Sequence, residues 1–579
     1  MKLKAFISAV MLAALGCTTG GAQGAIPDFG PNVLVFDSSM TNIQERVDAV
    51  FREQERSEFG SNRYAFLFKP GDYHLDVKVG FYMEVLGLGK SPDAVAITGA
   101  VRSKADWRKG NATCNFWRCM ENLSITPALD QNIDVWAVSQ GTDVRRVHVK
   151  GDMNLWDRGW ASGGFLADCR IDGWINSGTQ QQWCSRNSQF GRWLGGSWNM
   201  VFVGTVNPPE GNWPEKPYTV IEETPVIREK PYLFIDSTGG YFVMVPDLTI
   251  QGTRGATWGK EASTPGTALA IDQFYLARPE RDSAASINAA LDQGKQLLFT
   301  PGIYHLENSI HISRPNTVVL GLGYPTLIPD QGTPAMTISD VDGVEVGGLI
   351  LEAGVSNSAT LLQVGEGCGG NSHARNPVFL YDIFCRVGGA SVGVCDAMVT
   401  LNCNDVVGDN FWLWRADHGA GARWEGNKNR NGLIVNGDNV TLYGLFVEHC
   451  QEYQTLWNGN GGRVYFYQSE MPYDPPSPEA WRHGAVGGFA SYKVADSVRI
   501  HEAWGLGVYC VFYRAPIVAE NAIETPAVPG VSLHHMITLR LNGKPNSGIR
   551  HVINGTGDSV ITTKTAIVDQ FPQTAAETN

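Results

Sequence analysis

Hydrophobic residues along most of the chain occur in short runs of Val, Ile, Leu and Phe, separated by turns rich in Gly, Asn and Asp. Three such runs are VWAVSQ, RRVHVKG and GRVYFYQSE, and neighbouring runs follow at intervals of roughly 20–25 residues. No helical pattern between them is long enough to connect the strands of a doubly wound sheet. The pattern predicts a solenoid of stacked β-coils, in which each coil covers the apolar face of its neighbour. An antiparallel sandwich is the alternative.

One stretch of this pattern occurs twice. The sequence Pro-Gly-x-Tyr-His-Leu begins at Pro70 and again at Pro301, an offset of 231 residues, and each copy leads to Gly-Leu-Gly. A short segment with apolar residues at helical spacing precedes each copy, over residues 43–56 and 283–291. We therefore expect two copies of one plan, beginning near residues 60 and 295. In each copy the short helix should cover the edge of the first coil.

These features predict an all-β protein made of two tandem right-handed parallel β-helices, pectate-lyase-like solenoids packed side by side. The first is expected over residues 25–205 and the second over residues 266–579. Residues 206–265 contain the Pro-rich stretch NPPEGNWPEKPY. This segment is expected to cross from one stack to the other.

The first residues have the pattern of an export signal. Two lysines precede an apolar run over residues 5–16, and a small-residue cleavage site ends at Gly24. Residues 1–24 are therefore predicted to be a signal peptide and the product to be secreted, with lipid anchoring at Cys17 as the alternative. No other apolar run approaches the ~20 residues that span a bilayer, so no membrane span is expected.

Composition limits the functions that fit such a fold. Among 579 residues, 45 are basic and 58 acidic, a formal net charge of −13, and no basic block could follow a phosphate backbone. We therefore expect no nucleic-acid partner. Ten of the 11 cysteines would remain after export, an even number that permits disulfides, but their spacing and the scarcity of His predict no metal site. The sequons for N-glycosylation are Asn111, Asn122, Asn439 and Asn554.

A resemblance to a known family rests on several motifs. The stretch from Leu445 to Pro476, LFVEHCQEYQTLWNGNGGRVYFYQSEMPYDPP, resembles the VEH segment and the Q-x-E-x-P-Y-x-x-P pattern of glycoside hydrolase family 55. In the first half, NFWRCMENLSI, WAVSQGT, SGGFLAD and QQWCSRN occur in the order that this family shows. The family comprises secreted exo-β-1,3-glucanases built from two tandem β-helices. The resemblance implies a monomeric, cofactor-independent glycosidase that acts on β-1,3-glucan or a related cell-wall polysaccharide and inverts the anomeric configuration.

The spacing of four polar residues agrees with that resemblance. Glu448 and Glu470 are 22 residues apart, and so are Gln140 and Ser162. This interval is about one coil, and residues one coil apart lie on adjacent strands about 4.8 Å apart. Each pair is expected to stack, and the two stacks are expected to face each other within about 10 Å across a cleft between the solenoids.

Glycoside hydrolysis needs a proton for the leaving oxygen and an activated water at the anomeric carbon. The resemblance implies that Glu470 is the general acid. Burial or the like charge of Glu448 would keep it protonated at mildly acidic to neutral pH. Glu448, with Gln140 and Ser162 as hydrogen-bonding partners, is then expected to position and deprotonate the water.

Residues near the two glutamates are candidates for binding sugar. Flat pyranose faces pack on indole, and Trp457, between the glutamates, is the first candidate. Tyr473 and Asp474 follow the acid closely and are expected to shape the first subsite. The tryptophans of this region are Trp412, Trp414, Trp424, Trp457 and Trp481.

The pair Asp417 and His418 has two interpretations: sugar ligands, or a buried ion pair with Arg415. Two other functions also fit a β-helix. A polysaccharide lyase acts on uronates and usually needs a cation, Lys or Arg beside the substrate carboxylate, which the acidic chain disfavours. A non-catalytic glycan-binding protein would keep the tryptophans and could lose Glu470, so the presence of both glutamates favours an enzyme.

Overall fold

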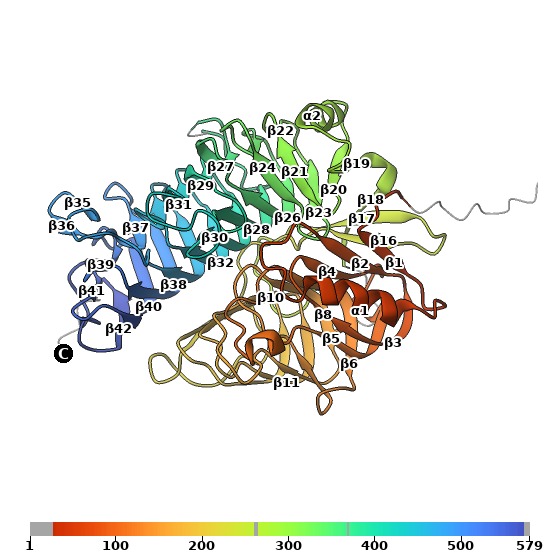
Figure 1. The fold of residues 1–579 in the computed structure, drawn as a ribbon, viewed down its shortest axis with the longest axis horizontal. Coiled ribbons are helices and arrows are strands. Elements are labelled where there is room, and N and C mark those ends of the chain that lie inside the picture. The colour runs from red at the N-terminus through yellow and green to blue at the C-terminus, as the bar shows by residue number, and fades with distance from the viewer. Residues whose placement is uncertain (1–26, 260–263, 368–369, 573–579) are drawn as a thin grey trace, which may run out of the picture.

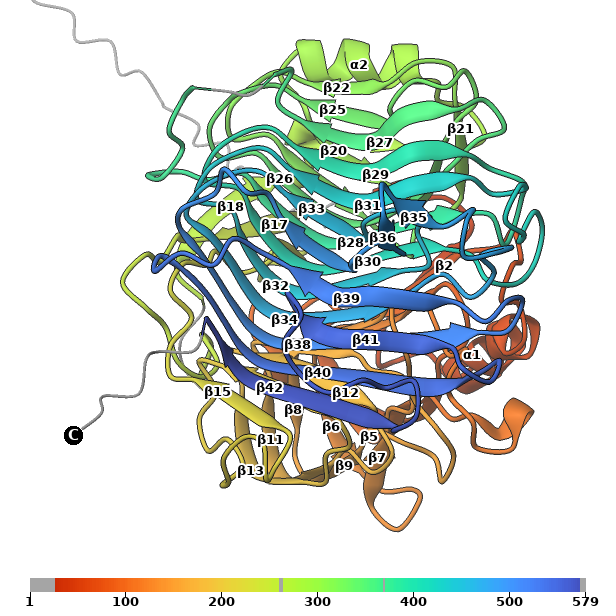
Figure 2. The same ribbon diagram turned by 90° about the vertical axis from the view of Figure 1, so that its left-hand side faces the viewer.

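The computed structural model describes residues 27–259, 264–367 and 370–572, which form two β-solenoids lying side by side (Figure 1 and Figure 2). In both, successive strands pair in parallel, so the predicted fold of two tandem parallel β-helices is confirmed. The predicted signal peptide, residues 1–24, and the alternative anchor at Cys17 lie outside the described residues.

The first solenoid begins with β1 and follows chain order along its main sheet to β15. The last pairing, of β14 with β15, extends this sheet past the predicted boundary at residue 205. The strands of the main path are β1 (Val33–Phe36), β2 (Tyr64–Phe68), β4 (Met83–Gly87), β6 (Arg118–Pro127), β8 (Asp143–Val149), β10 (Phe165–Ala167), β12 (Gln182–Arg186), β14 (Asn199–Val203) and β15 (Tyr218–Ile221). The other strands of its coils are β3 (Gly71–Lys78), β5 (Val95–Arg102), β7 (Ile133–Val135), β9 (Asp152–Asn154), β11 (Arg170–Asn176) and β13 (Gln189–Leu194).

A small antiparallel sheet follows the Pro-rich stretch and leads to the second solenoid. It consists of β16 (Tyr232–Ile235), β17 (Tyr241–Pro246) and β18 (Gly266–Ala270). Leu233 and Val243 of this sheet are buried in one cluster with Leu67 of the first solenoid and Leu298 of the second. The crossing segment therefore joins the first coils of both stacks, at the right of Figure 1.

The second solenoid has two long parallel sheets on different sides of its coils. The first contains β19 (Phe274–Ala277), β20 (Gln296–Phe299), β23 (Val318–Gly321), β26 (Glu345–Glu352), β28 (Phe379–Val387), β30 (Val407–Arg415), β32 (Thr441–Glu448), β34 (Gly462–Glu470), β38 (His501–Phe512), β40 (Val531–Gly543) and β42 (Thr565–Phe571). The second contains β22 (Ile310–Ile312), β25 (Met336–Ile338), β27 (Ser358–Val364), β29 (Cys395–Leu401), β31 (Asn429–Val435), β33 (Thr455–Trp457), β37 (Tyr492–Val494), β39 (Val518–Glu524) and β41 (Gly548–Ile553). Strands β21 (Ile303–Leu306) and β24 (Thr326–Pro329) join the first sheet, and β35 (Arg482–His483) pairs with β36 (Val486–Gly487).

The repeated motif builds the same first coil twice. Tyr73 on β3 and Tyr304 on β21 each pack edge to face on the phenylalanine that ends the preceding strand, with ring centroids 5.1 Å apart in both copies. Their hydroxyls donate to the carbonyls of Phe36 at 3.3 Å and Ala277 at 2.7 Å, which end β1 and β19. Each tyrosine therefore ties the first strand of its solenoid to the next coil, which accounts for the recurrence of the motif.

A short α-helix precedes each of these coils, as predicted. Helix α1 (Ile43–Gln54) buries Val47, and α2 (Ala284–Asp292) buries Ile287. Ser283 caps α2, because its hydroxyl accepts the backbone N–H of Ser286 at 3.3 Å. Figure 2 shows α2 across the end of the second solenoid, beside β22. Across the described ranges, no helix combines the length and apolar character that crossing a membrane requires.

Buried ion pairs join the two solenoids. Arg145 on β8 donates to Asp382 at 2.7 Å and to Asp409 at 2.7 Å. Arg186 on β12 also donates to Asp409, at 2.8 Å, and Lys230 lies 3.0 Å from Asp382. All of these side chains are buried. Because buried charges tolerate little displacement from their partners, the pairs hold the coils of one stack alongside those of the other.

The structure bears on two predicted covalent modifications, disulfide formation and N-glycosylation. The nine cysteines of the described segments are all free, so the disulfides that the even count permits do not form among them; Cys368 lies outside these segments. Asn122 is fully buried, and its amide donates to the carbonyls of Gly87 and Gly89 at 2.8 and 2.7 Å. A glycan needs an exposed amide, so the sequon prediction for Asn122 is wrong in the folded chain. The sequons that stay predictions are Asn111, which is half-buried, and Asn439 and Asn554, which are exposed.

Candidate active site

A cavity of about 580 Å³, here called the central cavity, lies between the two solenoids. Gln140 and Ser162 line it from the first solenoid, and Glu448 and Glu470 line it from the second. The Nε2 atom of Gln140 donates to Oε1 of Glu448 at 2.9 Å, across 308 residues of sequence. The expectation that these two pairs face each other is therefore confirmed.

Strand register places the two glutamates. Glu448 ends β32, Glu470 ends β34, and the two strands pair with these residues directly opposite each other. Trp414 occupies the same position one coil earlier and Tyr509 one coil later. The interval of 22 residues between the glutamates is thus one coil, as predicted.

The pair from the first solenoid is offset by one residue from its predicted register. Ser162 stacks on Ser139, with its backbone N–H donating to Ser139 Oγ at 3.0 Å, and Gln140 follows. Gly141 then adopts a φ of +68°, and a Cβ there would lie 2.5 Å from the ring of Trp412. Only glycine suits both this backbone conformation and the close approach of the indole.

Glu448 lies in a shell of hydrogen-bond donors. Oε1 accepts from Gln140 at 2.9 Å and from Gln468 at 2.8 Å, and Oε2 accepts from Trp412 Nε1 at 2.9 Å. Burial, followed by the nearby charge of Glu470, raises the pKa of Glu448, and the bonds from Trp412 and Gln468 oppose this. Because three N–H groups donate to its two oxygens, Glu448 is the glutamate of the pair on which a negative charge is better stabilised.

Glu470 has a different environment. Only 7% of the residue is exposed, and the Tyr473 hydroxyl donates to its Oε2. Burial raises the pKa of Glu470, against the opposing effects of His449 and Tyr473. Two buried carboxyls that stand side by side cannot both ionise readily, so the pair retains a proton well above the usual pH range for a glutamate.

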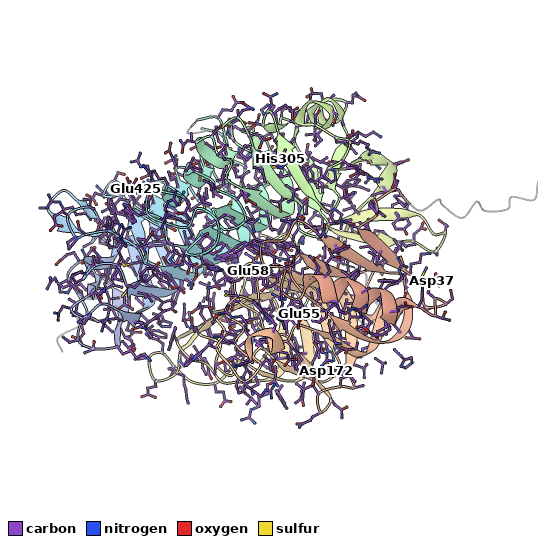
Figure 3. All side chains as sticks on the ribbon, viewed as in Figure 1. Asp37, Glu55, Glu58, Asp172, His305 and Glu425 are labelled. Atoms are coloured by element: carbon purple, nitrogen blue, oxygen red, sulfur yellow. The ribbon has the colours of Figure 1, made fainter. Side chains whose placement is uncertain are left out.

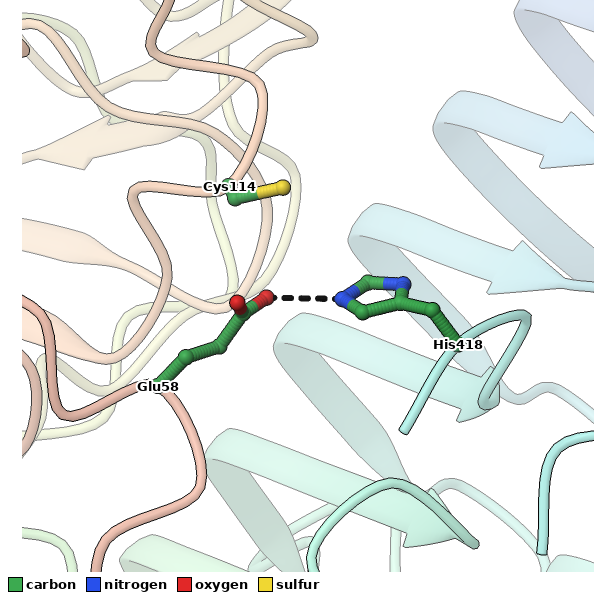
Figure 4. Close-up of side chains that lie close together, drawn as sticks. All are labelled: Glu58, Cys114 and His418. Carbon is green, nitrogen blue, oxygen red and sulfur yellow. Dashed lines mark hydrogen bonds and ion pairs between the residues drawn. The ribbon is translucent and has the colours of Figure 1, made fainter. Parts of the chain in front are cut away.

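Two further carboxylates, those of Glu58 and Asp417, line the cavity at the end formed by the coils that precede β32, and Glu58 lies at the centre of the molecule (Figure 3). His418 Nδ1 is 2.8 Å from Asp417, and His418 Nε2 is 2.8 Å from Glu58 of the first solenoid (Figure 4). Burial opposes protonation of His418, but these two carboxylates raise its pKa to about 10, so it is an imidazolium ion at neutral pH. The pair Asp417 and His418 therefore lines the cavity. It does not form the ion pair with Arg415 that the sequence left open.

The same end of the cavity contains a possible set of metal ligands. The donor atoms of Glu58, Cys114 and His418 lie within 4.8 Å of one another. However, both imidazole nitrogens of His418 already bind carboxylates, and burial raises the pKa of the Cys114 thiol to about 11. A metal would have to displace protons from both groups, so we assign this cluster to the ion pair.

Two predicted sugar ligands do not lie in the cavity. Trp457 is fully buried in the core of the second solenoid, where its ring packs on His501 with centroids 4.8 Å apart. Asp474 binds Arg415 through a two-pronged contact at 3.0 and 3.2 Å. The assignment of Trp457 to substrate binding is therefore wrong, because its side chain is enclosed in the core, whereas the assignment of Asp474 stays a prediction. Tyr473 does line the cavity.

Aromatic walls of the cavity come from other positions. Trp414 lines it and stacks on Trp412, with centroids 5.0 Å apart and planes 18° apart. Phe116 and Trp107 line it from the first solenoid. Trp412 holds Glu448, whereas the remaining tryptophans of the predicted cluster, Trp424 and Trp481, lie in the core.

Sequence reasoning missed several residues of this site. Gln468 carries a signal, because it precedes Glu470 by two positions and alternate residues of a strand share a face. Glu58 carries none, since it lies in a turn between α1 and β2, far from the motif in sequence. The lining residues that were missed besides Glu58 are Trp107, Arg108, Thr113, Cys114, Phe116, Gln181, His449 and Leu541.

Comparisons with known proteins agree with this architecture. A family model described as the LAM55 pectate lyase-like domain matches residues 274–470. The chain is 47% identical to an exo-beta-1,3-glucanase of Streptomyces sp. (strain SirexAA-E / ActE), over 98% of this chain and 93% of the relative. A glucan 1,3-beta-glucosidase of Cochliobolus carbonum is 26% identical over 38% of this chain and 32% of its own length.

Two solved structures share the fold of this chain. The structure of sacteLam55A from Streptomyces sp. SirexAA-E superposes with a TM-score of 0.91 at 46% identity, covering 94% of this chain and 99% of that one. A glutamate-to-alanine variant of sacteLam55A in complex with glucose matches with the same TM-score, identity and coverage.

Proposed function

This chain belongs to glycoside hydrolase family 55, the family of exo-β-1,3-glucanases, and from this premise we propose that it releases glucose from the ends of β-1,3-glucan chains. Cleavage inverts the configuration of the anomeric carbon by a single displacement with water. The observation that carries the proposal is the meeting of Gln140, Glu448 and Glu470 in one buried cavity. The solved relative, whose glutamate variant holds glucose, supports both the sugar and the importance of a carboxylate.

Glu470 is the general acid in this proposal. Burial raises its pKa, which favours the protonated form that a general acid needs. The Tyr473 hydroxyl donates to Oε2, which leaves Oε1 to carry the proton toward the leaving oxygen. After the bond breaks, Glu470 becomes a carboxylate, and Tyr473 stabilises the new charge by the same hydrogen bond.

Glu448 is the general base. Its three donors hold both oxygens in place and favour the charged form, which can accept a proton from water. Gln140 and Ser162, on the opposite wall, supply further polar groups for that water. The proton of the water passes to Glu448 as its oxygen attacks the anomeric carbon, and the leaving hydroxyl takes the proton of Glu470.

Exo action is supported by the end of the cavity at Glu58 and His418. Glu58 comes from the first solenoid and His418 from the second, so their ion pair bridges the two walls (Figure 4). Phe59 adds a second bridge, stacking on Trp414 with planes 5° apart. A glucan chain cannot thread through a bridged end, so only its terminal residue enters there.

Secretion is the remaining part of the proposal. The export pattern over residues 1–24 fits an enzyme whose polymeric substrate lies outside the cell. Amino-terminal sequencing of the protein from culture medium tests it, with a start near Ala25 expected. Recovery of the protein in the membrane fraction with a lipid on Cys17 would contradict it.

Hydrolysis of defined glucans tests the activity. The purified protein is incubated with soluble β-1,3-glucan and with β-1,4- and β-1,6-linked glucans, and early products are separated by chromatography. We expect glucose from the β-1,3-linked substrate alone, appearing first as the α-anomer in proton NMR spectra. Release of the β-anomer first would exclude inversion. Products with a carbon–carbon double bond would indicate a lyase, and binding without any product would indicate a glycan-binding protein.

A further inference from the structure

Gln140, which donates to the candidate base, lies in a turn that both solenoids fix. The turn consists of Gln140, Gly141 and Thr142 and leads directly into β8. From the first solenoid, the backbone N–H of Trp117 donates to the carbonyl of Gly141 at 3.0 Å. From the second, the Nδ2 atom of Asn410 on β30 donates to the carbonyl of Thr142 at 3.1 Å, across 268 residues of sequence. The position of this turn therefore depends on a side chain that does not line the central cavity.

Asn410 occupies a corner of the second solenoid at which the backbone is left-handed. Its φ is +71°, and the positions opposite it on the preceding and following coils are Asp382 and Gly444, with φ of +49° and +69°. Asparagine, aspartate and glycine are the residues that adopt this conformation most readily. At Gly444 the ring of Phe165 packs so closely that a Cβ would lie 2.7 Å from it. Of these three corners, only that of Asn410 carries an amide that can donate to a backbone carbonyl of the first solenoid.

The amide of Asn410 is held in one orientation. Its Nδ2 atom donates to the carbonyl of Thr142 and also to Oδ1 of Asp382, at 2.8 Å. That carboxylate is fixed in turn by Arg145, whose Nη2 atom donates to the same oxygen at 2.7 Å. Because both neighbours of the amide are acceptors, only its NH₂ group can face them. A rotated amide would place its oxygen against a carboxylate and a carbonyl.

This orientation leaves one atom of Asn410 without a partner. The residue is 1% exposed, and among the described residues its Oδ1 atom has no hydrogen-bond donor. A buried acceptor without a donor destabilises the folded chain, and such atoms are rare in native proteins. An apolar side chain at this corner would avoid the loss but would also release the carbonyl of Thr142. The retained amide therefore points to a need to hold this turn in place.

We propose that Asn410 is a positioning residue for the activation of water. By holding the carbonyl of Thr142, it fixes the turn from which the amide of Gln140 reaches Glu448. The inference rests on the proposed function, in which Glu448 is the general base. Without the bond to Thr142, the amide of Gln140 loses its orientation. The charged form of Glu448 then loses part of the stabilisation that this donor supplies.

Two substitutions of Asn410 test this inference. Asn410→Gly tolerates the left-handed backbone and removes the amide. Asn410→Asp also suits that backbone, but its one possible O–H would bond the carboxylate of Asp382, so Thr142 loses its donor. If Asn410→Gly does not fold, Asn410→Asp alone decides the test.

The pH dependence of kcat is the readout that a purely structural role would not move. For both variants we expect kcat on soluble β-1,3-glucan to fall about five- to tenfold, the usual effect of one hydrogen bond, while KM changes less than about twofold. The acid limb of the pH–rate profile should move to higher pH by up to about one unit, in the same direction as in Gln140→Ala. An acid limb that stays at the wild-type pH would overturn the inference.

Asn122 provides a matched control. It is a buried asparagine with a left-handed backbone in the first solenoid, with φ of +53°, and its amide donates to the carbonyls of Gly87 and Gly89. Asn122→Gly should lower the melting temperature about as much as Asn410→Gly, because each variant loses two hydrogen bonds of a buried amide. Only Asn410→Gly should move the acid limb. Equal shifts in both variants would indicate a general loss of rigidity and would contradict the specific role of Asn410.

A double-mutant cycle separates action through Gln140 from other effects. If Asn410 acts through Gln140, adding Asn410→Gly to Gln140→Ala should lower kcat by less than about twofold further. A further loss as large as in the single variant would refute that route. If the wild type releases no glucose from β-1,3-glucan, the proposed function fails. If it does, and Gln140→Ala moves the acid limb while neither Asn410 variant does, only the positioning role fails.

Discussion

Gln140 of the first solenoid donates a hydrogen bond of 2.9 Å to Glu448 of the second, so the candidate base takes its orientation from both halves of the chain. Neither solenoid contains the site by itself. Arg145 follows Gln140 on the same coil, and its buried ion pairs with Asp382 and Asp409 fix the spacing across which this bond forms. The duplication of the β-helix thus creates a cleft whose two walls supply different partners to this bond, an amide from one side and a carboxylate from the other.

Replacement of Glu470 by Gln should preserve the fold and lower kcat on unactivated β-1,3-glucan by ~10²–10⁴, the usual contribution of a general acid. An aryl β-glucoside should lose much less, because its leaving group needs little protonation. Steady-state kinetics on both substrates checks this, with Glu479→Gln, an exposed glutamate nearby, as the control. Equal losses on both substrates would argue against the acid role.

Replacement of Gln140 by Ala should move the acid limb of the pH–rate profile to higher pH, by up to about one unit. The variant removes a donor from the carboxylate of Glu448, and the charged form loses that stabilisation. Because the base must be ionised, the variant loses activity at a higher pH than the wild type when the pH is lowered. Gln140→Asn, which keeps an amide, is the matched variant. If the rate falls equally at every pH and the acid limb does not move, the prediction is wrong, and Gln140 acts in substrate binding and not on the pKa of Glu448.

Replacement of Glu58 by Gln should lower the pKa of His418 from about 10 toward its ordinary value, since one of its two carboxylate partners is removed. The imidazole would then lose its proton at a lower pH than in the wild type, while Asp417 still favours the charged form. Titration of the His418 ring by NMR measures this shift. Chromatography of the glucan products provides the functional readout, because a weakened bridge should allow longer products than glucose.

Replacement of Lys230 by Met should destabilise the protein by ~3–5 kcal/mol, the usual cost of leaving buried charges without their partner. Lys230 is buried and lies 3.0 Å from Asp382, and it also contacts Glu121. Chemical denaturation should therefore show an earlier midpoint. Lys428→Met, which removes an exposed ion pair with Glu425, should cost less than ~1 kcal/mol. Similar midpoints for both variants would contradict the structural importance of the buried pair.

Stability should fall as the pH rises from mildly acidic to about 8, in part because of Asp134. Burial raises the pKa of Asp134 from 3.8 to about 8, so between these values the folded chain holds a proton that the unfolded chain releases. The contribution is fully present below pH 3.8 and is lost as the pH passes through about 8. Melting temperatures of Asp134→Asn across this range should decline less than those of the wild type. Asp106→Asn, at an exposed aspartate, should leave the decline unchanged.

Much of the fold could be predicted from the sequence because most contacts of a solenoid join neighbouring coils, which are close in the chain. The duplicated Tyr73 and Tyr304 each close a first coil by contacts within a few dozen residues, and the paired intervals follow the same spacing. The glutamates at 448 and 470 needed only a regular coil between them to be placed in register. The predicted register was wrong by one residue at Ser162, which stacks on Ser139 and not on Gln140, since the turns of the first solenoid vary in length.

The sequence by itself determined the two β-helices, their initial helices and the glutamate pair, because repeating apolar strands and a fixed coil length are properties of neighbouring residues. Only the tertiary structure decided which side chains share the cavity. Trp457 lies between the glutamates in sequence but on the opposite sheet, in the core, whereas Glu58 lies hundreds of residues away and binds His418. Buried charges and aromatic rings at the interface set how two solenoids align, and this alignment depends on contacts that no local pattern records.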